Sequence, residues 1–296
     1  MKSELPVIYP PHPNPRKPKF AMPPGTCDAH FHIFGPPDRF PYASTRVYTP
    51  PAAPLEHYFN LMEILGTEHG VVVQPNAHGL DNTVTLDAIA RSGGRFRGIA
   101  KADDTFSYGD LETLHEGGIR GVRFNLIAEL GGKPKLAMYE RVIERITPLG
   151  WSVTLHMLPP ELVEIADWIR AIRIPLIIDH FARVNFADGV EQKPYQTLLE
   201  LAAEEHVWVK ISCAERLSAL GPPYADALPF AHALIEAAPD RLLWGTDWPH
   251  TQRFKPGQMC DDGDLVDLLP EMVPDAAILN RTLVDNPARL FGFDQS

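Results

Sequence analysis

Cysteine is scarce in this chain of 296 residues: Cys27, Cys213 and Cys260 are the only three, and no CxxC pair exists. This number and spacing favour neither a disulfide framework nor a thiolate zinc knuckle, and they are typical of a reducing cytosol. Long apolar runs are missing too, since no segment approaches the roughly 20 apolar residues of a membrane span and the N-terminus has no signal-peptide pattern. We therefore expect a cytoplasmic protein that does not enter the membrane.

Positive charge is in deficit. The chain has 27 Lys and Arg against 38 Asp and Glu, which gives a net charge of −11 with the histidines neutral. Nucleic acids and anionic membranes attract basic surfaces, so we expect general affinity for neither. A small anionic substrate remains compatible with this balance, because a few arginines in a pocket can set the local field.

Proline is concentrated at the start of the chain. Residues 1–25 contain the stretches PPHPNP and KPKFAMPPG. Proline has no backbone N–H and a fixed φ, so this segment cannot lie inside a sheet or form a regular helix. We expect an extended arm over residues 1–25 that wraps a single domain formed by residues 26–296.

Beyond the arm, short β-branched segments alternate with longer helical patterns. Several short segments are almost continuously apolar, as expected of parallel strands buried on both faces. The strand candidates span residues 26–34, 69–74, 96–102, 119–125, 152–157, 175–180, 207–212 and 241–248. Eight such units predict an α/β fold of the (β/α)₈ TIM-barrel type, which commonly has about 250 residues. A doubly wound open sheet is the alternative, but no GxGxxG follows any strand.

Histidine and aspartate stand at the carboxyl ends of the predicted strands, which meet at one mouth in a parallel barrel. His30 and His32 end the first strand, His156 ends the fifth and Asp247 ends the eighth. Alternate residues of a strand point to the same face, so His30 and His32 can bind one cation together. A pair of hydrogen-bonded structural histidines would give the same motif. Three imidazoles and a carboxylate suit one divalent ion, Zn²⁺ first, with Mn²⁺, Co²⁺ or Fe²⁺ as alternatives.

The same residues predict a hydrolase. A bound divalent ion would lower the pKa of its water to about 7, which supplies hydroxide for attack on a carbonyl. Asp247 could take the proton from that water and pass it to the leaving group. His180, at the end of the sixth strand, could donate a hydrogen bond to the carbonyl or act as a further ligand.

Arginines form a second group at the strand ends. Arg123, Arg183 and Arg216 lie at or just beyond the fourth, sixth and seventh strands. Guanidinium groups bind carboxylates or sulfonates through paired hydrogen bonds. Arg123 lies within a strand end and is hard to explain as a surface charge, whereas Arg183 and Arg216 could be ordinary salt-bridge residues. Together they predict a substrate with two or more negative groups.

Four further residues are candidates for lining the pocket. They are Tyr48, Asn76, His78 and His250. Loop capping would explain Asn76 and His78 equally well, and His250 could be an ordinary loop residue.

Several motifs resemble the amidohydrolase superfamily, most of all its branch of 2-pyrone-4,6-dicarboxylate lactonase and related lactone hydrolases. Between Gly25 and Phe293 these motifs are DAHFHIFGP, HGLDNTVTLDAIA, HEGGIRGVRFN, IIDH, CAERL, WGTDWPH and DNPARLFGF. The superfamily's metal site consists of the HxH pair, histidines after strands 5 and 6 and an aspartate after strand 8. The matching residues are His30, His32, His156, His180 and Asp247. Arg123 stands where two-metal members carry a bridging lysine or glutamate, so the resemblance implies a single metal ion.

Two departures from the pyrone-dicarboxylate lactonase concern its substrate pocket. That enzyme looks metal-free, with tyrosine at the place of His156 and arginine at the place of Glu129. The resemblance therefore implies a different small anionic lactone, one that carries a carboxylate and a sulfonate. The implied reaction is the opening of 4-sulfomuconolactone to maleylacetate and sulfite.

Several alternatives stay open. A metal-free lactonase for 2-pyrone-4,6-dicarboxylate is one, and a lyase that decarboxylates aromatic acids is another. A sugar-lactone hydrolase or isomerase is a third, although three arginines exceed the needs of a neutral sugar lactone. A barrel kept only for binding is disfavoured by the full set of titratable strand-end groups. The sequence leaves open the metal, the exact lactone and whether the chain forms a homo-oligomer.

Overall fold

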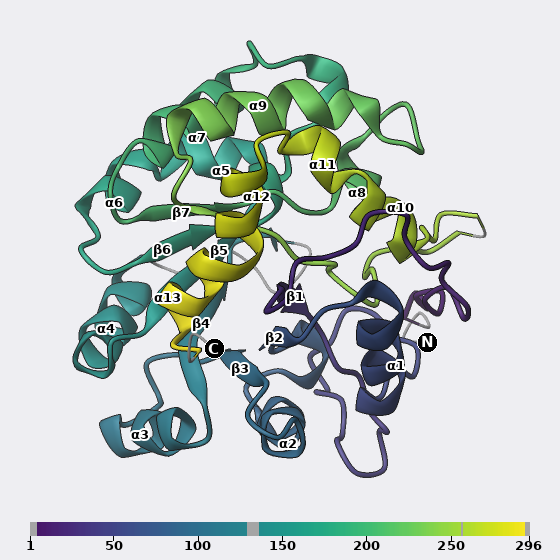
Figure 1. Cartoon of the computed structure of the whole chain (residues 1–296). Helices are drawn as coiled ribbons and strands as arrows, with labels where there is room; N and C mark the ends of the chain where they lie inside the picture. Colours follow the sequence, from purple (N-terminus) through teal and green to yellow (C-terminus); the bar gives the residue numbers. More distant parts are fainter. Residues whose placement is uncertain (1–4, 129–135, 256, 294–296) are drawn as a thin grey trace.

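Eight parallel strands form the centre of the computed structural model, which describes residues 5–128, 136–255 and 257–293 (Figure 1). The strands are β1 (Cys27–Phe31), β2 (His69–Val73), β3 (Phe96–Ala100), β4 (Ile119–Asn125), β5 (Ser152–His156), β6 (Leu176–Ile178), β7 (Val207–Lys210) and β8 (Leu242–Leu243). Each pairs with the next along the chain. The predicted TIM barrel is confirmed, and all eight predicted strands are present, although most end earlier than predicted.

The ring closes between β1 and the segment that follows β8. The N–H of Ala29 donates to the carbonyl of Trp244 at 2.9 Å, and the N–H of Asp247 donates to the carbonyl of His30 at 2.8 Å. Gly245 permits this approach, because a Cβ there would overlap the backbone nitrogen of His30. Closure of the barrel therefore brings Asp247 against His30.

Helices surround the ring and bury its outer face (Figure 1). They are α1 (Leu55–Leu65), α2 (Thr83–Arg91), α3 (Tyr108–Glu116), α4 (Leu136–Ile146), α5 (Pro159–Glu164), α6 (Ala166–Ala171), α7 (Lys193–Ala202), α8 (Ala214–Leu217), α9 (Leu228–Ala237), α10 (Asp262–Asp267), α11 (Leu269–Met272), α12 (Ala276–Asn280) and α13 (Asn286–Phe291). Aromatic pairs join the two layers: Phe31 stacks on Tyr58 of α1 at 3.6 Å between ring centroids, and Phe124 on Tyr139 of α4 at 3.8 Å. None of the described helices is long and apolar enough to cross a membrane.

A smaller apolar cluster fills the interior of the barrel. It joins Val71 of β2 to Ile177 of β6, strands on opposite sides of the ring, so these side chains can meet only across the interior. Phe291 and Phe293 complete the cluster, and the guanidinium of Arg97 lies 4.9 Å from the Phe293 ring centroid. The interior is thus packed and closed near the amino ends of the strands, which leaves the carboxyl ends for a site.

The N-terminal arm lies against the segments that follow β8. Arg16 forms ion pairs with Asp264 at 2.6 Å and Asp267 at 2.7 Å, both in α10. The N–H of Tyr9 donates to the carbonyl of Arg253 at 2.8 Å. The division into an arm of residues 1–25 and a barrel of residues 26–296 stays a prediction.

Candidate active site

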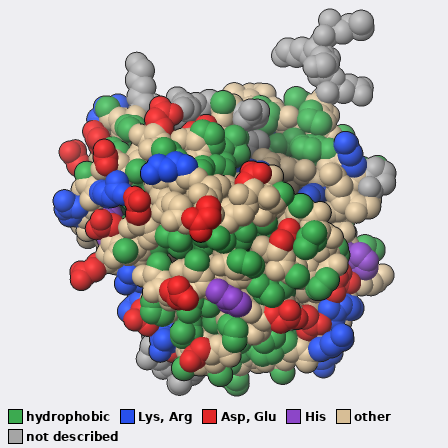
Figure 2. Space-filling model, turned by 90° about the horizontal axis from the view of Figure 1, so that it is seen from above, with side chains coloured by type: hydrophobic (Ala, Val, Ile, Leu, Met, Phe, Trp, Pro, Cys, Tyr) green, Lys and Arg blue, Asp and Glu red, His purple; other side chains and the backbone are tan. Residues whose placement is uncertain are grey.

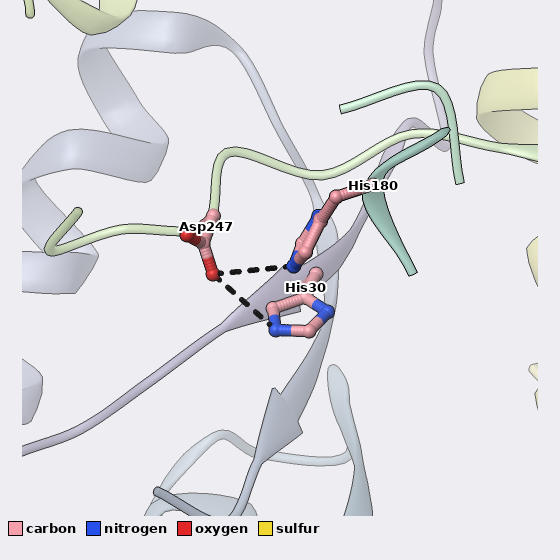
Figure 3. Close-up of side chains that lie close together, drawn as sticks. All are labelled: His30, His180 and Asp247. Atoms are coloured by element: carbon pink, nitrogen blue, oxygen red, sulfur yellow. Dashed lines mark ion pairs between the residues drawn. The ribbon is translucent and has the colours of Figure 1, made fainter. Parts of the chain in front are cut away.

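Four side chains converge at the carboxyl end of the barrel, three of them drawn in Figure 3. Nε2 of His30 lies 3.3 Å from Nε2 of His32, and Oδ1 of Asp247 lies 3.4 Å from each of these nitrogens. Nε2 of His180 is 3.7 Å from the same oxygen. All four residues are buried. Three ring nitrogens thus converge on one carboxylate oxygen, from β1, its extension and the loops after β6 and β8.

The histidines present ring nitrogens to one point. Nδ1 of His32 hydrogen-bonds the carbonyl of Val73 at 2.7 Å, so Nε2 is the atom that His32 directs at the donor group. Nδ1 of His180 contacts the Ser212 hydroxyl at 2.7 Å, and its Nε2 is buried without a hydrogen-bond partner among the described residues. Burial lowers the pKa of His180 to about 4 and that of His30 well below its ordinary value, so both rings are neutral at pH 7. Neutral imidazole is the metal-binding form.

The separations of the donor atoms fit a divalent ion. In a tetrahedral zinc site with bonds of about 2.0–2.1 Å, neighbouring ligand atoms lie about 3.3–3.4 Å apart. The distances among His30, His32 and Asp247 match this spacing. His30, His180 and Asp247 also form a group whose ligand atoms lie within 4.8 Å of one another. Nitrogen and carboxylate donors suit Zn²⁺ or Mn²⁺.

Asp247 is held as a carboxylate. Its Oδ2 accepts hydrogen bonds from the guanidinium of Arg216 at 2.6 Å and from the thiol of Cys213 at 3.3 Å. Burial opposes its ionisation, but the charge of Arg216 outweighs that effect and holds its pKa well below the usual range. Oδ2 is therefore engaged, while Oδ1 faces the histidines.

A buried ion-pair network behind His30 was missed by the sequence analysis. Asp179 Oδ1 lies 3.1 Å from Lys210 Nζ, and Oδ2 accepts from Arg123 Nε at 2.8 Å. Nδ1 of His30 lies 2.9 Å from Lys210 Nζ and 3.4 Å from Asp179 Oδ1. Nδ1 of His30 can therefore accept a hydrogen bond from Lys210 or donate one to Asp179. When it donates, the proton is on Nδ1 and Nε2 is free to bind a metal. A lysine inside the apolar strand VWVK is the signal that would have revealed this network.

An unusual backbone turn positions His180 and Arg183. The four consecutive residues from His180 to Arg183 have φ values of 52°, 51°, 52° and 58°. A left-handed conformation costs L-residues roughly 1–2 kcal/mol each. Asp247 and Cys213 also have positive φ, at 58° and 64°. Such strain is characteristic of functional sites, where the surrounding structure enforces it.

His156, predicted as a metal ligand, lies outside the donor group. Its Nε2 accepts a hydrogen bond from Arg183 at 3.3 Å, and its Nδ1–H donates to Oδ1 of Asn125 at 3.2 Å. Both ring nitrogens are thus engaged. Burial, with the charges of Arg123 and Arg183, lowers the pKa of His156 and keeps the ring neutral. The structure thus groups His180 with His30 and Asp247, while the role of His156 as a metal ligand stays a prediction.

A pocket opens beside the donor group. It is lined by His32, Tyr48, Pro75, Asn76, Arg123, His156, His180, Arg216, Asp247, Thr251 and Gln252. Four predicted substrate contacts, Tyr48, Asn76, Arg123 and Arg216, are among these residues. Arg183 lies behind the lining, where its guanidinium donates to His156 at 3.3 Å and to Gln252 at 3.0 Å.

Two predicted pocket residues lie elsewhere. His78 is buried beside Tyr42, with 4.9 Å between ring centroids, and its Nδ1–H donates to the carbonyl of Pro41 at 3.2 Å. His250 is fully buried against Asp262, 3.0 Å away. Glu129, the other departure from the lactonase pattern, lies outside the described residues.

Comparison with known proteins identifies the family. The amidohydrolase family model matches residues 27–293. The chain is 49% identical to a 4-sulfomuconolactone hydrolase of Rhizobium radiobacter over 92% of both chains, and 41% identical to a 2-pyrone-4,6-dicarboxylate hydrolase of Comamonas testosteroni over 94% of this chain and 93% of that one. A solved structure of a probable 2-pyrone-4,6-dicarboxylic acid hydrolase from Acinetobacter baumannii, with citric acid bound, has a TM-score of 0.80 at 30% identity and covers 91% of this chain and 100% of that one. The chain therefore belongs to the amidohydrolase family, in its group of lactone hydrolases.

Proposed function

We propose that this chain is a metal-dependent hydrolase that opens a small anionic lactone, with 4-sulfomuconolactone as the favoured substrate. The observation that carries the proposal is the donor group of His30, His32, His180 and Asp247, which adjoins a pocket lined by arginines. The lactone class comes from the relatives, one of which is named for 4-sulfomuconolactone. That solved relative is named for 2-pyrone-4,6-dicarboxylic acid, a substrate with two carboxylates.

The charge of the pocket is opposite to that of the whole chain. The net charge is −11, and Figure 2 shows acidic and basic side chains interspersed on one face. Near the donor group lie four cations, Arg123, Arg183, Arg216 and Lys210, and the two carboxylates of Asp179 and Asp247. Four minus two leaves a surplus of two positive charges before any metal is added. A lactone with two anionic groups would neutralise this surplus.

The crowding of these cations appears in the pKa of Arg183. Burial and then the charge of Arg216 lower that pKa to about 10. A nearby anion would relieve the repulsion, so binding of a carboxylate or sulfonate is favoured here over binding of a neutral group.

Hydrolysis requires one new bond, one broken bond and one proton transfer. The oxygen of water bonds to the carbonyl carbon, the acyl–oxygen bond of the ring breaks, and a proton moves from water to the ring oxygen. A divalent ion, when bound, polarises the carbonyl and lowers the pKa of a water molecule. Asp247, held as a carboxylate by Arg216, is the proton carrier. In 4-sulfomuconolactone, ring opening leaves hydroxyl and sulfonate on one carbon, which collapses to the ketone of maleylacetate and releases sulfite.

The matched pair His180→Ala and His156→Ala tests this proposal. We expect His180→Ala to lose both bound zinc and lactone hydrolysis. His156→Ala should retain the zinc, because its nitrogens face Arg183 and Asn125. Zinc content, loss of ring absorbance and sulfite release are the measurements, made on chelated and zinc-restored protein. Full turnover by protein shown to be free of metal would reject the metal-dependent route.

A second candidate is hydrolysis of 2-pyrone-4,6-dicarboxylate without a metal. The surplus of positive charge and the relative named for that substrate favour it. Turnover of the pyrone that persists in strong chelator would select this candidate. Release of carbon dioxide from an aromatic acid would instead select the lyase alternative.

A further inference from the structure

A second group of buried donor side chains lies beside Arg216, outside the active site described above. Glu215 belongs to α8, His250 follows β8 and Cys260 precedes α10. One ligand atom from each lies within 4.8 Å of the others. We propose that Glu215, His250 and Cys260 bind a second divalent metal ion of the zinc type. This proposal does not depend on the function proposed above.

Key donor atoms in this cluster lack hydrogen bonds. Both carboxylate oxygens of Glu215 and Nδ1 of His250 are buried without a hydrogen-bond partner among the described residues. The Glu215 side chain is 1% exposed and that of His250 is 0% exposed. Oε1 lies 3.7 Å from Nδ1, which is longer than a hydrogen bond. Positive groups of His250, Arg253 and Arg216 lie 3.7–3.9 Å from Oε1 of Glu215, beyond hydrogen-bond distance. A buried carboxylate without hydrogen bonds is costly, and a cation between these atoms would remove that cost.

The second nitrogen of His250 completes the arrangement typical of a metal ligand. Its Nε2 lies 3.0 Å from Oδ1 of Asp262, the first residue of α10, and donates to it. Metal-bound histidines almost always donate their other ring N–H to a carboxylate, a carbonyl or water, which fixes the ring and its tautomer. Donation from Nε2 to Asp262 turns Nδ1 of His250 toward Glu215, where it would bind a metal after releasing its own proton.

The local charges balance with a divalent ion. Burial raises the pKa of Cys260 to about 11, so the thiol is protonated until a metal displaces its proton. In the metal-bound state, with the protons of Cys260 and His250 Nδ1 released, Glu215, Asp262 and the thiolate carry three negative charges, and Arg253, 3.7 Å from Oε1 of Glu215, carries one positive charge. Arg216 also approaches Oε1 at 3.9 Å, but Asp247 at 2.6 Å already compensates it. The remaining charge of minus two matches a divalent cation. Oxygen, nitrogen and sulfur donors together suit Zn²⁺ and disfavour Ca²⁺ and Mg²⁺.

The position of this cluster suggests what the metal does. Glu215 immediately precedes Arg216, and His250 immediately precedes Thr251 and Gln252; all three of these neighbours line the pocket. A metal between Glu215 and His250 would tie the segment after β7 to the segment after β8. The second site is therefore a structural clamp that positions one wall of the substrate pocket.

Cobalt titration tests the second site with a readout that the first site lacks. Cobalt(II) bound to a thiolate has a strong charge-transfer band in the near ultraviolet, whereas a site of imidazoles and carboxylate has none. We expect the metal-free full-length chain to take up two equivalents of Co²⁺, one of which produces this band. Cys260→Ser should abolish the band and one equivalent, while the matched variant Cys27→Ser keeps both. Glu215→Gln should weaken the band-forming equivalent at least about tenfold, since a charged ligand is lost.

The outcomes separate this proposal from the function proposed above. His180→Ala should remove the equivalent without the band and leave the thiolate band in place. Should Cys260→Ser fail to fold, anomalous scattering at the zinc edge from crystals of the unaltered protein replaces it, with a peak expected between Glu215, His250 and Cys260. The second site would be overturned by any of three results. These are Co²⁺ uptake without a thiolate band, a band that survives in folded Cys260→Ser, and the absence of an anomalous peak at this cluster. None of these results would bear on the first.

Discussion

At the amino ends of the strands the barrel interior is filled with apolar side chains, whereas at the carboxyl ends it holds buried charges. Phe291 and Phe293 close the first end. Asp179, Lys210 and Asp247 occupy the second, each 1% exposed or less. Burial of apolar surface stabilises the fold directly, but burial of charge does so only when geometry and partners offset desolvation. The buried charges at the carboxyl end therefore serve the reaction and lower the stability of the fold.

The backbone shows the same contrast. Nine described residues other than glycine have positive φ, and all lie in the segments that follow β6, β7 and β8. They include His180, Arg183 and Asp247 of the active site and His250 of the second cluster. Strain of this kind persists only where the surrounding structure enforces it. Substitutions at the two ends should therefore separate activity from stability.

The largest effect is expected at His180. His180→Asn should lower kcat/KM on the lactone by at least about 10²-fold, because it removes a proposed metal ligand and with it the activation of water, which is worth several kcal/mol. Asparagine tolerates positive φ better than most residues, so the free energy of unfolding should change by no more than about 1 kcal/mol. Urea unfolding midpoints and steady-state kinetics measure the two effects. A loss of stability as large as the loss of activity would contradict the contrast between the two ends.

The opposite pattern is expected at the amino end. Phe291→Ala should lower the free energy of unfolding by about 3–5 kcal/mol, because it leaves a cavity in the packed interior. The kcat of the folded fraction should stay unchanged, since Phe291 belongs to the apolar cluster of the interior and does not line the pocket. Phe254→Ala is the matched control, because this ring is 40% exposed. A fall in kcat for folded Phe291→Ala would show that the two ends are coupled.

A smaller effect is expected at Arg183. Arg183→Met should raise KM for an anionic lactone by about 10–100-fold with a smaller change in kcat, as expected for loss of charged hydrogen bonds worth about 1.5–3 kcal/mol. KM for a neutral lactone should not rise. Arg170→Met is the control, because Arg170 pairs with Asp167 and Glu200 on the surface. Equal effects on charged and neutral lactones would assign Arg183 to holding His156 in place.

Periodicity was sufficient to predict the barrel, because parallel strands buried on both faces leave nearly continuous apolar runs. The position of each polar residue at a strand end then predicted which residues share the mouth. The extent of the last strand was not predictable. Residues 241–248 were expected to be extended, but β8 contains only Leu242–Leu243, since the chain turns onto β1 beyond Gly245.

The choice between His156 and His180 could not be made from spacing. His180 reaches the donor group from a left-handed turn that contains no glycine. Glycine is the residue that usually indicates such a turn in a sequence, so this turn could not be predicted. His156 ends a regular strand, where Asn125 and Arg183 engage its ring. Lys210 was missed although it ends a strand: its partner Asp179 is 31 residues away in sequence, and the pairing of Ile178 with Val209 on adjacent strands brings the two together.

The smallest effect is expected at His78, which follows β2 but has apolar and aromatic surroundings. Burial lowers the pKa of His78, despite an opposing hydrogen bond to Pro41. The unfolded chain therefore binds a proton below about pH 6.5 that the folded chain resists, and stability is lost as the pH falls below that value. His78→Phe should reduce this loss and leave kcat/KM unchanged, as judged from urea midpoints at about pH 7.5 and 5.5 and from kinetics at the higher pH. A tenfold or greater fall in kcat/KM would show that His78 contributes to the substrate pocket. Unchanged activity would show that the catalytic part of the barrel mouth does not extend to His78.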